Sequence, residues 1–226
     1  MSITVQVYKK LPTPIQHFIS FNFVTYEKWL LEYIPEKGNV ALDIGSNRGF
    51  WALHLAKTFN EVYCFEPRVP NDFFKRTRKY KNKIKLINWA LWDHSDRLEL
   101  HICKESSHNF ISNNNQNSPD KTRYTLEVRA EPLDRLYIHN KIDFIKIDVE
   151  GAESKVLTGA LQTIQTNNPI ILTEIHSKDQ GIRCSVILEH LNYKLQKIQS
   201  PYEPTSEEHY FILATPPTAH PVNKLF

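Results

Sequence analysis

The order of short apolar segments and helical segments between residues 40 and 90 is the feature that most constrains the fold. Strands are indicated at VALDI (40–44), EVYCFEP (61–67) and KIKLINWA (83–90), and helices at residues 49–59 and 71–82 between them. Connections this short are typical of parallel strands joined by helices that cover both faces of one sheet. The sequence therefore predicts an α/β fold.

The second half of the chain departs from this order and then resumes it. Residues 96–103 and 123–130 alternate polar and apolar side chains, as half-exposed antiparallel strands do, so we expect a β-hairpin inserted before the fourth parallel strand. The polar residues 104–122 between them are expected to form a mobile loop. The order continues with strands at 141–148 and 169–176, helices at 151–165 and 183–192, and a closing pair of strands at 193–200 and 209–216.

The length of 226 residues suits one α/β domain, which we place at residues 35–215. Residues 1–34 are expected to form an N-terminal arm that covers the cofactor site, with a helix in the second half of residues 18–34. Residues 216–226 are rich in proline and are expected to form a flexible tail.

The bulk composition is that of an ordinary globular protein. A net charge of +3 creates no whole-molecule field that would direct the chain to nucleic acid or to a membrane. The three cysteines are widely spaced and form no C-x-x-C motif, which argues against a disulfide framework or a zinc knuckle and favours a reducing compartment. The first residues lack the apolar core of a signal peptide, and no segment approaches the ~20 apolar residues of a membrane span, so the expected location is the cytoplasm.

The positive charge is concentrated in residues 73–85, which hold seven Lys or Arg and no acid. The favoured interpretation is the solvated face of a helix, with Phe73, Phe74 and Tyr80 turned inward. The competing interpretation is a surface for an anionic partner, such as RNA or an acidic glycan.

A glycine-bracketed turn, Gly45-Ser46-Asn47-Arg48-Gly49, follows the first strand and indicates a cofactor site. A dinucleotide fold would carry a second glycine where Asn47 stands, so that a pyrophosphate could approach the backbone. No P-loop motif is present either. Asp43, two residues before Gly45, would repel a phosphate but suits a ligand with a cationic amine and a sulfonium. S-adenosylmethionine (SAM) is such a ligand.

A second acid, Glu66, ends the second strand 23 positions after Asp43. A carboxylate there accepts the hydroxyls of a ribose. Nicotinamide enzymes place an acid at the same point, so it is the pair with the D-x-G-x-x-x-G turn that favours SAM. In a purely structural interpretation, Asp43 would only cap a turn and Glu66 would be a surface acid.

The segments VALDIGSNRGFWAL, VYCFEP, LINWALWDHSDRLEL, DFIKIDVEGAESKVLTGA and IILTEIH, in that order, resemble the FkbM family of SAM-dependent methyltransferases. K-x-D-x-E-G-A-E is the most specific of these motifs. The resemblance covers residues 35–215 and implies the seven-stranded class I methyltransferase sheet, with the last strand antiparallel. It also implies SAM as the cofactor and O-methylation of sugars, glycans or secondary metabolites. Asn192 stands where the family usually has glycine, which costs little because asparagine tolerates a left-handed helix end.

Candidate catalytic residues lie at the ends of the fourth and fifth parallel strands: Asp148 and Glu150, and Glu174 and His176. Ligands of open α/β sheets bind at such carboxyl ends. Lys146, on the same pleat as Asp148, needs a carboxylate partner, with Asp148 or Glu174 expected. In purely structural roles, Glu150 would be a helix-start acid and His176 would bond to a backbone carbonyl.

Two mechanisms fit these residues. Asp148 or His176 would act as a general base on the acceptor hydroxyl. Alternatively, Asp148, Glu174 and His176 would bind a divalent ion such as Mg²⁺, which would lower the pKa of the hydroxyl. The metal is less favoured, because hard ions prefer oxygen ligands.

The remaining cofactor contacts are expected from the turn and from the end of the third strand. Gly45, Ser46 and Gly49 of the turn would bind the cofactor, with Asn47 and Phe50 at its methionine part. Asn88, Ala90 and Trp92 follow the third strand, where the resemblance implies that the adenine stacks. Trp92 would alternatively pack in the core, as aromatic residues near strand ends often do.

The sequence thus predicts a SAM-dependent O-methyltransferase that acts on a sugar, a glycan or a small metabolite. An RNA methyltransferase is the competing enzyme class; it rests on the basic segment alone, since no [DN]-P-P-[YF] motif or Pro-Cys nucleophile follows the expected strand. A SAM-binding protein without activity and a nicotinamide dehydrogenase are less favoured. The acceptor and the oligomeric state cannot be predicted from this sequence.

Overall fold

The computed structural model describes residues 28–103, 110–112, 122–200 and 206–217. The chain divides into two compact units, Met1–Ile34 and Pro35–Phe226. Within the described part of the first unit the chain forms a 3-10 helix, η1 (Lys28–Tyr33), where we expected the end of an α-helix. The rest of the expected arm, and the tail beyond residue 217, lie outside the described residues. That the arm covers the cofactor site stays a prediction.

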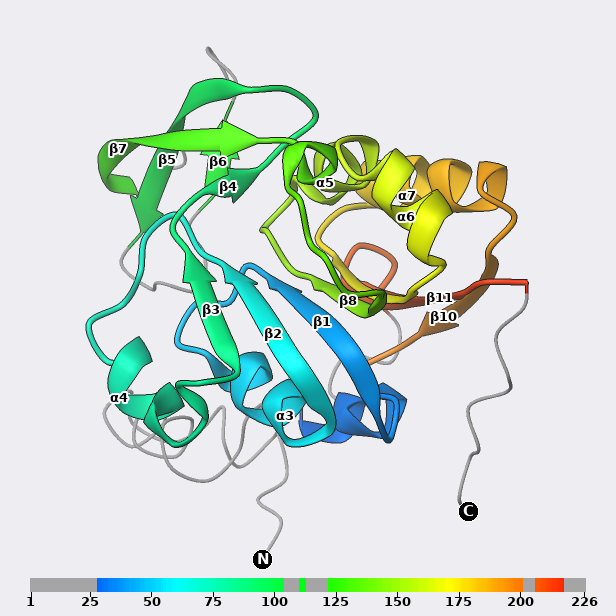
Figure 1. The fold of residues 1–226 in the computed structure, drawn as a ribbon. Helices are drawn as coiled ribbons and strands as arrows, with labels where there is room; N and C mark the ends of the chain where they lie inside the picture. Colours follow the sequence, from blue (N-terminus) through cyan, green and yellow to red (C-terminus); the bar gives the residue numbers. More distant parts are fainter. Residues whose placement is uncertain (1–27, 104–109, 113–121, 201–205, 218–226) are drawn as a thin grey trace, which may run out of the picture. The chain divides into compact units, whose positions relative to one another are not determined.

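The second unit is built on a mostly parallel sheet, which confirms the α/β prediction (Figure 1). Seven strands run in the order β10-β11-β9-β8-β1-β2-β3, and β11 is antiparallel to both of its neighbours. The strand bounds are β1 (Gly38–Ile44), β2 (Phe59–Phe65), β3 (Ile84–Ile87), β8 (Ile142–Ile147), β9 (Ile170–Ile175), β10 (Lys194–Ile198) and β11 (Tyr210–Thr215).

The core lies around the central strands β1 and β8. Every side chain from Val40 to Ile44 is buried, and Phe144–Ile147 are buried as well. Strands covered on both faces read as continuous apolar runs rather than as alternating patterns. The two polar side chains in these runs, Asp43 and Lys146, lie at paired positions of β1 and β8.

Helices follow the parallel strands. Helix α3 (Phe50–Thr58) packs on β1 and β2, and α7 (Lys178–His190) packs on β9 and β10. Helix α7 begins five residues before its expected start, because Ser177 caps it by accepting a hydrogen bond from the amide of Gln180 (3.2 Å). The expected helix 71–82 is α4 (Phe73–Thr77) followed by the 3-10 helix η2 (Arg78–Tyr80).

The prediction of a single helix at 151–165 was wrong. The segment forms two helices, α5 (Glu153–Thr158) and α6 (Leu161–Asn167), separated at Gly159. A Cβ at Gly159 would lie 1.9 Å from the carbonyl oxygen of Trp92, so the backbones of two segments approach there too closely for any side chain. The break is therefore set by a tertiary contact.

A second sheet contains the two strands expected as a hairpin. Strands β5 (Asp96–Cys103) and β7 (Thr122–Glu131) pair antiparallel within a four-stranded sheet of order β4-β7-β5-β6. Two expectations fail here. The strand expected at 83–90 ends at Ile87, and β4 (Ala90–Leu91) pairs with β7 instead. Part of the expected loop, Phe110–Ser112, forms β6.

A small apolar cluster under the second sheet explains why β3 ends at Ile87. Ala90 and Trp92 are buried in it together with Leu98, Val128 and Ala152. Burial of these side chains favours turning the chain away from β3 after Ile87.

Among the described residues, no helix combines the length and the hydropathy that a bilayer-spanning segment requires.

Candidate active site

The turn after β1 has the backbone of a ligand-binding loop. Gly45 and Gly49 have φ of +81° and +79°, in the left-handed region that favours glycine. A Cβ at Gly45 would lie 1.7 Å from the carbonyl oxygen of Asp148. The amide of Gly45 donates a hydrogen bond to the carbonyl of Phe65 (2.9 Å), which ties the turn to the end of β2. The predicted turn is thus held against the ends of both neighbouring strands.

Asp43 is a fully buried carboxylate at the entrance to this turn, on β1 beside Lys146 of β8. By hydrogen-bond geometry, neither carboxylate oxygen is satisfied within the described residues, although the hydroxyl of Ser46 and the amide of Ala52 lie close enough to lower its pKa. Burial raises the pKa of Asp43 to about 6, and the nearby charge of Lys146 offsets only part of this rise. A buried acceptor without a donor is costly, so the protein holds Asp43 at the expense of its own stability.

Glu66 follows β2 directly and binds the turn through its carboxylate. One oxygen accepts a hydrogen bond from the amide of Asn47 (2.9 Å) and the other from the amide of Arg68 (3.0 Å). Burial raises the pKa of Glu66 to about 7, although the two amides lower it. Glu66 is therefore not a free surface acid. Asp43 thus lies in β1 and Glu66 directly after the neighbouring strand β2, and both are next to the turn.

The remaining predicted cofactor contacts differ in exposure. Ser46 is buried and donates a hydrogen bond to the carbonyl of Asp43 (2.7 Å), and Phe50 is half-buried against His54. Asn88 is exposed, whereas Ala90 and Trp92 are buried in the apolar cluster of the second sheet. This placement favours a packing role for Trp92. Contact of these residues with a cofactor stays a prediction.

The four predicted catalytic residues come together at the carboxyl ends of β8 and β9. Nε2 of His176 lies 3.5 Å from Glu150, 3.7 Å from Asp148 and 3.9 Å from Glu174, in each case measured to a carboxylate oxygen. These distances exceed a normal hydrogen bond, so three carboxylates surround the ring nitrogen without any one of them binding it tightly.

Two further residues of this cluster were missed from the sequence. Glu153 is fully buried and accepts a hydrogen bond from Nδ1 of His176 (2.8 Å) and another from the amide of Gly151 (2.9 Å). His209 donates through Nε2 to Glu174 (2.6 Å). Glu153 stands in the motif E-G-A-E, but the sequence does not show which way its side chain points. That direction depends on the position at which α5 begins. His209 becomes visible only once β11 is known to lie beside β9.

Lys146 pairs with Asp148, as expected. Its Nζ lies 2.8 Å from Oδ2 of Asp148, and the lysine side chain is 3% exposed. Burial opposes ionisation of Asp148, but the charges of Lys146 and His176 outweigh it and hold the pKa of this carboxyl below its ordinary value. Asp148 is therefore ionised at neutral pH.

His176 and Glu150 have strongly altered proton affinities. Burial lowers the pKa of His176, but the hydrogen bond to Glu153 and the charge of Asp148 outweigh it and raise this pKa to about 10. Burial raises the pKa of Glu150 to about 8, although the charge of His176 opposes the rise. Glu150 also has a φ of +55°, which is unusual for a residue with a side chain. Shifted acids and strained backbone together mark functional sites more often than structural ones.

Groups that could hold a metal ion share His176. One comprises Glu174, His176 and His209, and another comprises Asp148, Glu150 and His176. The set expected from the sequence, Asp148 with Glu174 and His176, is divided between these two groups. Both sets include a histidine, whereas Mg²⁺ prefers oxygen ligands.

The glycine turn lies next to the first residue of the acid–histidine cluster. The amide of Asp148 donates a hydrogen bond to the carbonyl of Ile44 (3.0 Å), immediately before Gly45. A ligand held by the turn would therefore lie next to Asp148. The buried carboxylate of Asp43 thus lies one turn of chain away from groups that can accept a proton.

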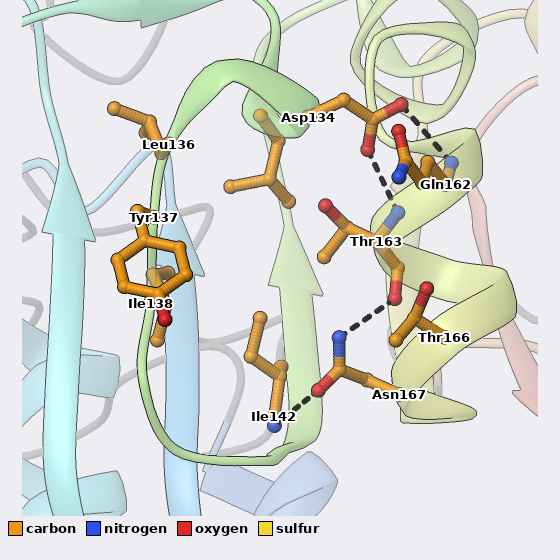
Figure 2. Close-up of a pocket in the computed structure, with 10 residues that line it drawn as sticks. Asp134, Leu136, Tyr137, Ile138, Ile142, Gln162, Thr163, Thr166 and Asn167 are labelled. Carbon is orange, nitrogen blue, oxygen red and sulfur yellow. Dashed lines mark hydrogen bonds between the residues drawn. The ribbon is translucent and has the colours of Figure 1, made fainter.

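A separate pocket lies at the opposite, amino end of β8, between α6 and the segment Leu133–Ile138 (Figure 2). Its polar atoms serve the fold. The carboxylate of Asp134 accepts hydrogen bonds from the amides of Gln162 (3.0 Å) and Thr163 (2.8 Å) at the start of α6, and Asn167 accepts one from the amide of Ile142 (2.9 Å). These contacts leave little chemistry for a ligand.

Comparison with known proteins identifies related sequences and folds. The profile of the methyltransferase FkbM domain matches residues 43–211. No curated protein sequence matches the chain significantly. The structure of the FkbM methyltransferase from Methylobacillus flagellatus is similar at a TM-score of 0.58 with 18% identity, over 79% of this chain. This chain spans only 44% of that protein.

Further solved structures share the fold at lower identity. A protein assigned as an rRNA methylase, from Clostridium thermocellum, matches with a TM-score of 0.53 and 9% identity, over 84% of this chain and 92% of that one. A SAM-dependent O-methyltransferase from Thermotoga maritima matches with a TM-score of 0.50 and 11% identity, over 93% of this chain and 73% of that one. At these identities the likeness concerns the fold alone.

Proposed function

Because the chain belongs to the FkbM family of methyltransferases, we propose that it transfers the methyl group of SAM to a hydroxyl oxygen of a sugar, a glycan or another small metabolite. The observation that carries this proposal is the buried Asp43, which is not satisfied by a hydrogen bond of acceptable geometry among the described residues and stands at the entrance to the glycine turn. A cationic ligand would supply what this carboxylate lacks.

The residues of the turn fit SAM. Asp43 would attract its positively charged methionine part, and Glu66 would accept hydrogen bonds from the ribose hydroxyls while it holds the turn through Asn47. The absence of a side chain at Gly45 lets the turn approach Asp148 closely. A pyrophosphate would instead meet the buried carboxylate of Asp43 and the half-buried carboxylate of Glu66, so a dinucleotide fits poorly.

When bound, SAM supplies a methyl group on a sulfonium, which is already a strong electrophile. The protein must align the acceptor hydroxyl, exclude water and remove one proton. We assign proton acceptance to Asp148, because Lys146 holds its Oδ2 while its Oδ1 faces His176. With a pKa of about 10, His176 is protonated at neutral pH and is therefore the weaker candidate for the base. As a cation, it would stabilise negative charge that develops on the acceptor oxygen.

The types of ligand favour a mechanism without a metal. Each group among the described residues that could hold an ion includes His176, whereas a hard ion such as Mg²⁺ prefers oxygen ligands. A divalent ion held by the histidine-containing groups is the competing mechanism, with a chelator as its test.

A methyl-transfer assay tests the proposal. The protein is incubated with SAM labelled in the methyl group and with panels of glycans, nucleotide sugars and RNA, with and without a chelator. We expect label in a hydroxylated sugar or metabolite that survives the chelator. Label in RNA alone would refute the acceptor class, and activity that disappears with the chelator would replace the carboxylate mechanism by the metal one.

Asp148→Asn provides the matched site test. It should lower kcat by about 10²–10⁴-fold, the usual contribution of a general base, and leave the Kd for SAM nearly unchanged. Asp179→Asn is the control, because Asp179 is exposed on α7 and pairs only with Arg183 among the described residues. If Asp148→Asn retains activity, the assignment of the base is wrong.

The three cysteines, Cys64, Cys103 and Cys184, are buried free thiols. Buried thiols without disulfides support a reducing compartment, and we propose the cytoplasm.

A further inference from the structure

The basic segment 73–85 does not have the structure of a simply solvated helix. That interpretation requires Phe73 and Phe74 to turn inward. Phe73 is 1% exposed, as expected, but Phe74 is 67% exposed. An exposed phenylalanine in the middle of a cationic segment requires another explanation.

Part of the positive charge in this segment serves the fold. Arg76 pairs with Asp72 (2.8 Å), Lys83 donates hydrogen bonds to the carbonyls of Ala56 and Phe59, and Lys85 pairs with Glu61. The remaining four cations have exposed side chains and form no ion pair with any described residue. Together with Phe74 they form what we call the α4 surface: Phe74, Lys75, Arg78, Lys79 and Lys81.

The α4 surface is fixed to the rest of the domain by the opposite side of the same helix. Phe73 and Thr77 are buried and pack against the cofactor turn at Gly49, where the absence of a side chain makes room for them. Phe74 rests edge-on against Phe73, with ring centroids 5.7 Å apart. The helix thus presents Phe74 outward from an anchored position, and Figure 1 shows α4 at the periphery, beyond the edge strand β3.

We propose that the α4 surface binds the headgroup region of an anionic phospholipid membrane, with Phe74 inserted among the lipids. An aromatic side chain flanked by lysines is suited to that boundary, because the ring leaves water while the ammonium groups stay with the headgroups. Each basic side chain near an anionic bilayer strengthens binding about fivefold, so four of them give an effect of several hundredfold. Burial of the phenylalanine adds about tenfold or more.

A nucleic acid is the competing partner, and the composition of the α4 surface disfavours it. Three of its four cations are lysines, which act as hydrated point charges rather than as the bidentate donors that suit phosphates and bases. Single strands bind along grooves with several aromatic residues for successive bases. The α4 surface offers one exposed aromatic side chain on a five-residue helix.

Vesicle sedimentation with the full chain tests this inference without relying on methyl transfer. Vesicles of phosphatidylcholine with about one-third phosphatidylglycerol should bind the protein at low salt, and neutral phosphatidylcholine vesicles should not. Substituting Gln for Lys75, Arg78, Lys79 and Lys81 together should weaken binding at least a hundredfold. Phe74→Ser should weaken it about tenfold while keeping the dependence on salt.

Two control variants match these changes elsewhere on the surface. Lys194→Gln with Lys197→Gln removes exposed cations from β10, and Val186→Ser removes an apolar side chain that is 60% exposed. Both should bind vesicles as the unsubstituted protein does. Failure of the anionic vesicles to bind, or equal loss in the controls, would overturn the inference. Tight binding of RNA through the same four cations, with no binding to vesicles, would replace the membrane by nucleic acid as the partner.

Discussion

At the scale of single residues, Asp43 lowers the stability of the ligand-free protein but is needed for the proposed binding of SAM. Its pKa is raised to about 6 from an ordinary 3.8, so the folded state binds a proton more strongly than the unfolded chain does. The free energy of unfolding therefore decreases as pH rises through this interval. We expect Asp43→Asn to stabilise the ligand-free protein by about 1–3 kcal/mol at pH 8 and by much less near pH 4. Denaturant unfolding at the two pH values measures this difference.

The same variant separates the two roles of Asp43, because it should also abolish SAM binding. A variant that is less stable than the parent at pH 8, or that binds SAM as the parent does, would contradict the account.

Glu153 is expected to act through His176. It holds Nδ1, which leaves Nε2 facing Asp148 and Glu150. Glu153→Gln keeps an acceptor of the same shape but removes the charge, so it should lower the pKa of His176 and lower kcat about tenfold or more. The Kd for SAM should stay the same. The pKa of His176 is measured by NMR titration, and kcat and KM are measured for the same variant. If Glu153 has only a structural role, kcat and KM should both remain those of the parent.

At the scale of elements, the turn after β1 is the part least tolerant of change. Gly45→Ala combines a φ of +81° with a Cβ that would lie 1.7 Å from the Asp148 carbonyl, so the backbone of β1 or β8 must move. We expect a loss of about 2–4 kcal/mol in the free energy of unfolding, and loss of SAM binding.

Gly151→Ala is the control for strain without collision. Gly151 has a φ of +100°, but a Cβ there would meet no atom within 4 Å. It should cost only about 1–3 kcal/mol, the strain of that backbone conformation. If both variants lose the same stability, close packing of the turn against Asp148 is not what requires glycine.

The elements also show how far local sequence predicts structure. Strands β1, β2, β8 and β9 lie within two residues of their predicted bounds, because runs buried on both faces have a clear apolar signal. The break at Gly159 and the end of β3 at Ile87 could not be predicted, because they depend on contacts with Trp92 and with β7, which are distant in sequence. Exposure of Phe74 was likewise missed, since two adjacent phenylalanines give no indication of which one faces the core.

The candidate site follows the same division. Asp148, Glu150, Glu174 and His176 were predicted because each lies at or just after the carboxyl end of a parallel strand, and such ends meet at one edge of a sheet. Glu153 and His209 complete the cluster through a helix start and through the register of β11 beside β9. Neither contact has a local signal.

At the scale of the whole molecule, opposite charges occupy different elements. The net charge of +3 conceals a cluster of acids at the ends of β8 and β9 and a concentration of bases on the α4 surface. The acidic cluster suits a cationic cofactor, and the α4 surface suits an anionic partner.

Isothermal titration of the ligand-free protein with SAM and, separately, with NADH tests the central claim most directly. Asp43 has a pKa of about 6 and must be ionised to attract the cationic part of SAM. Glu66 has a pKa of about 7 and must be ionised to accept hydrogen bonds from the ribose hydroxyls. SAM should therefore bind at pH 8, bind more weakly at pH 5.5, and release no heat with Asp43→Asn, while NADH should not bind. Binding of NADH in preference to SAM, or binding of SAM that ignores both pH and Asp43, would contradict the account.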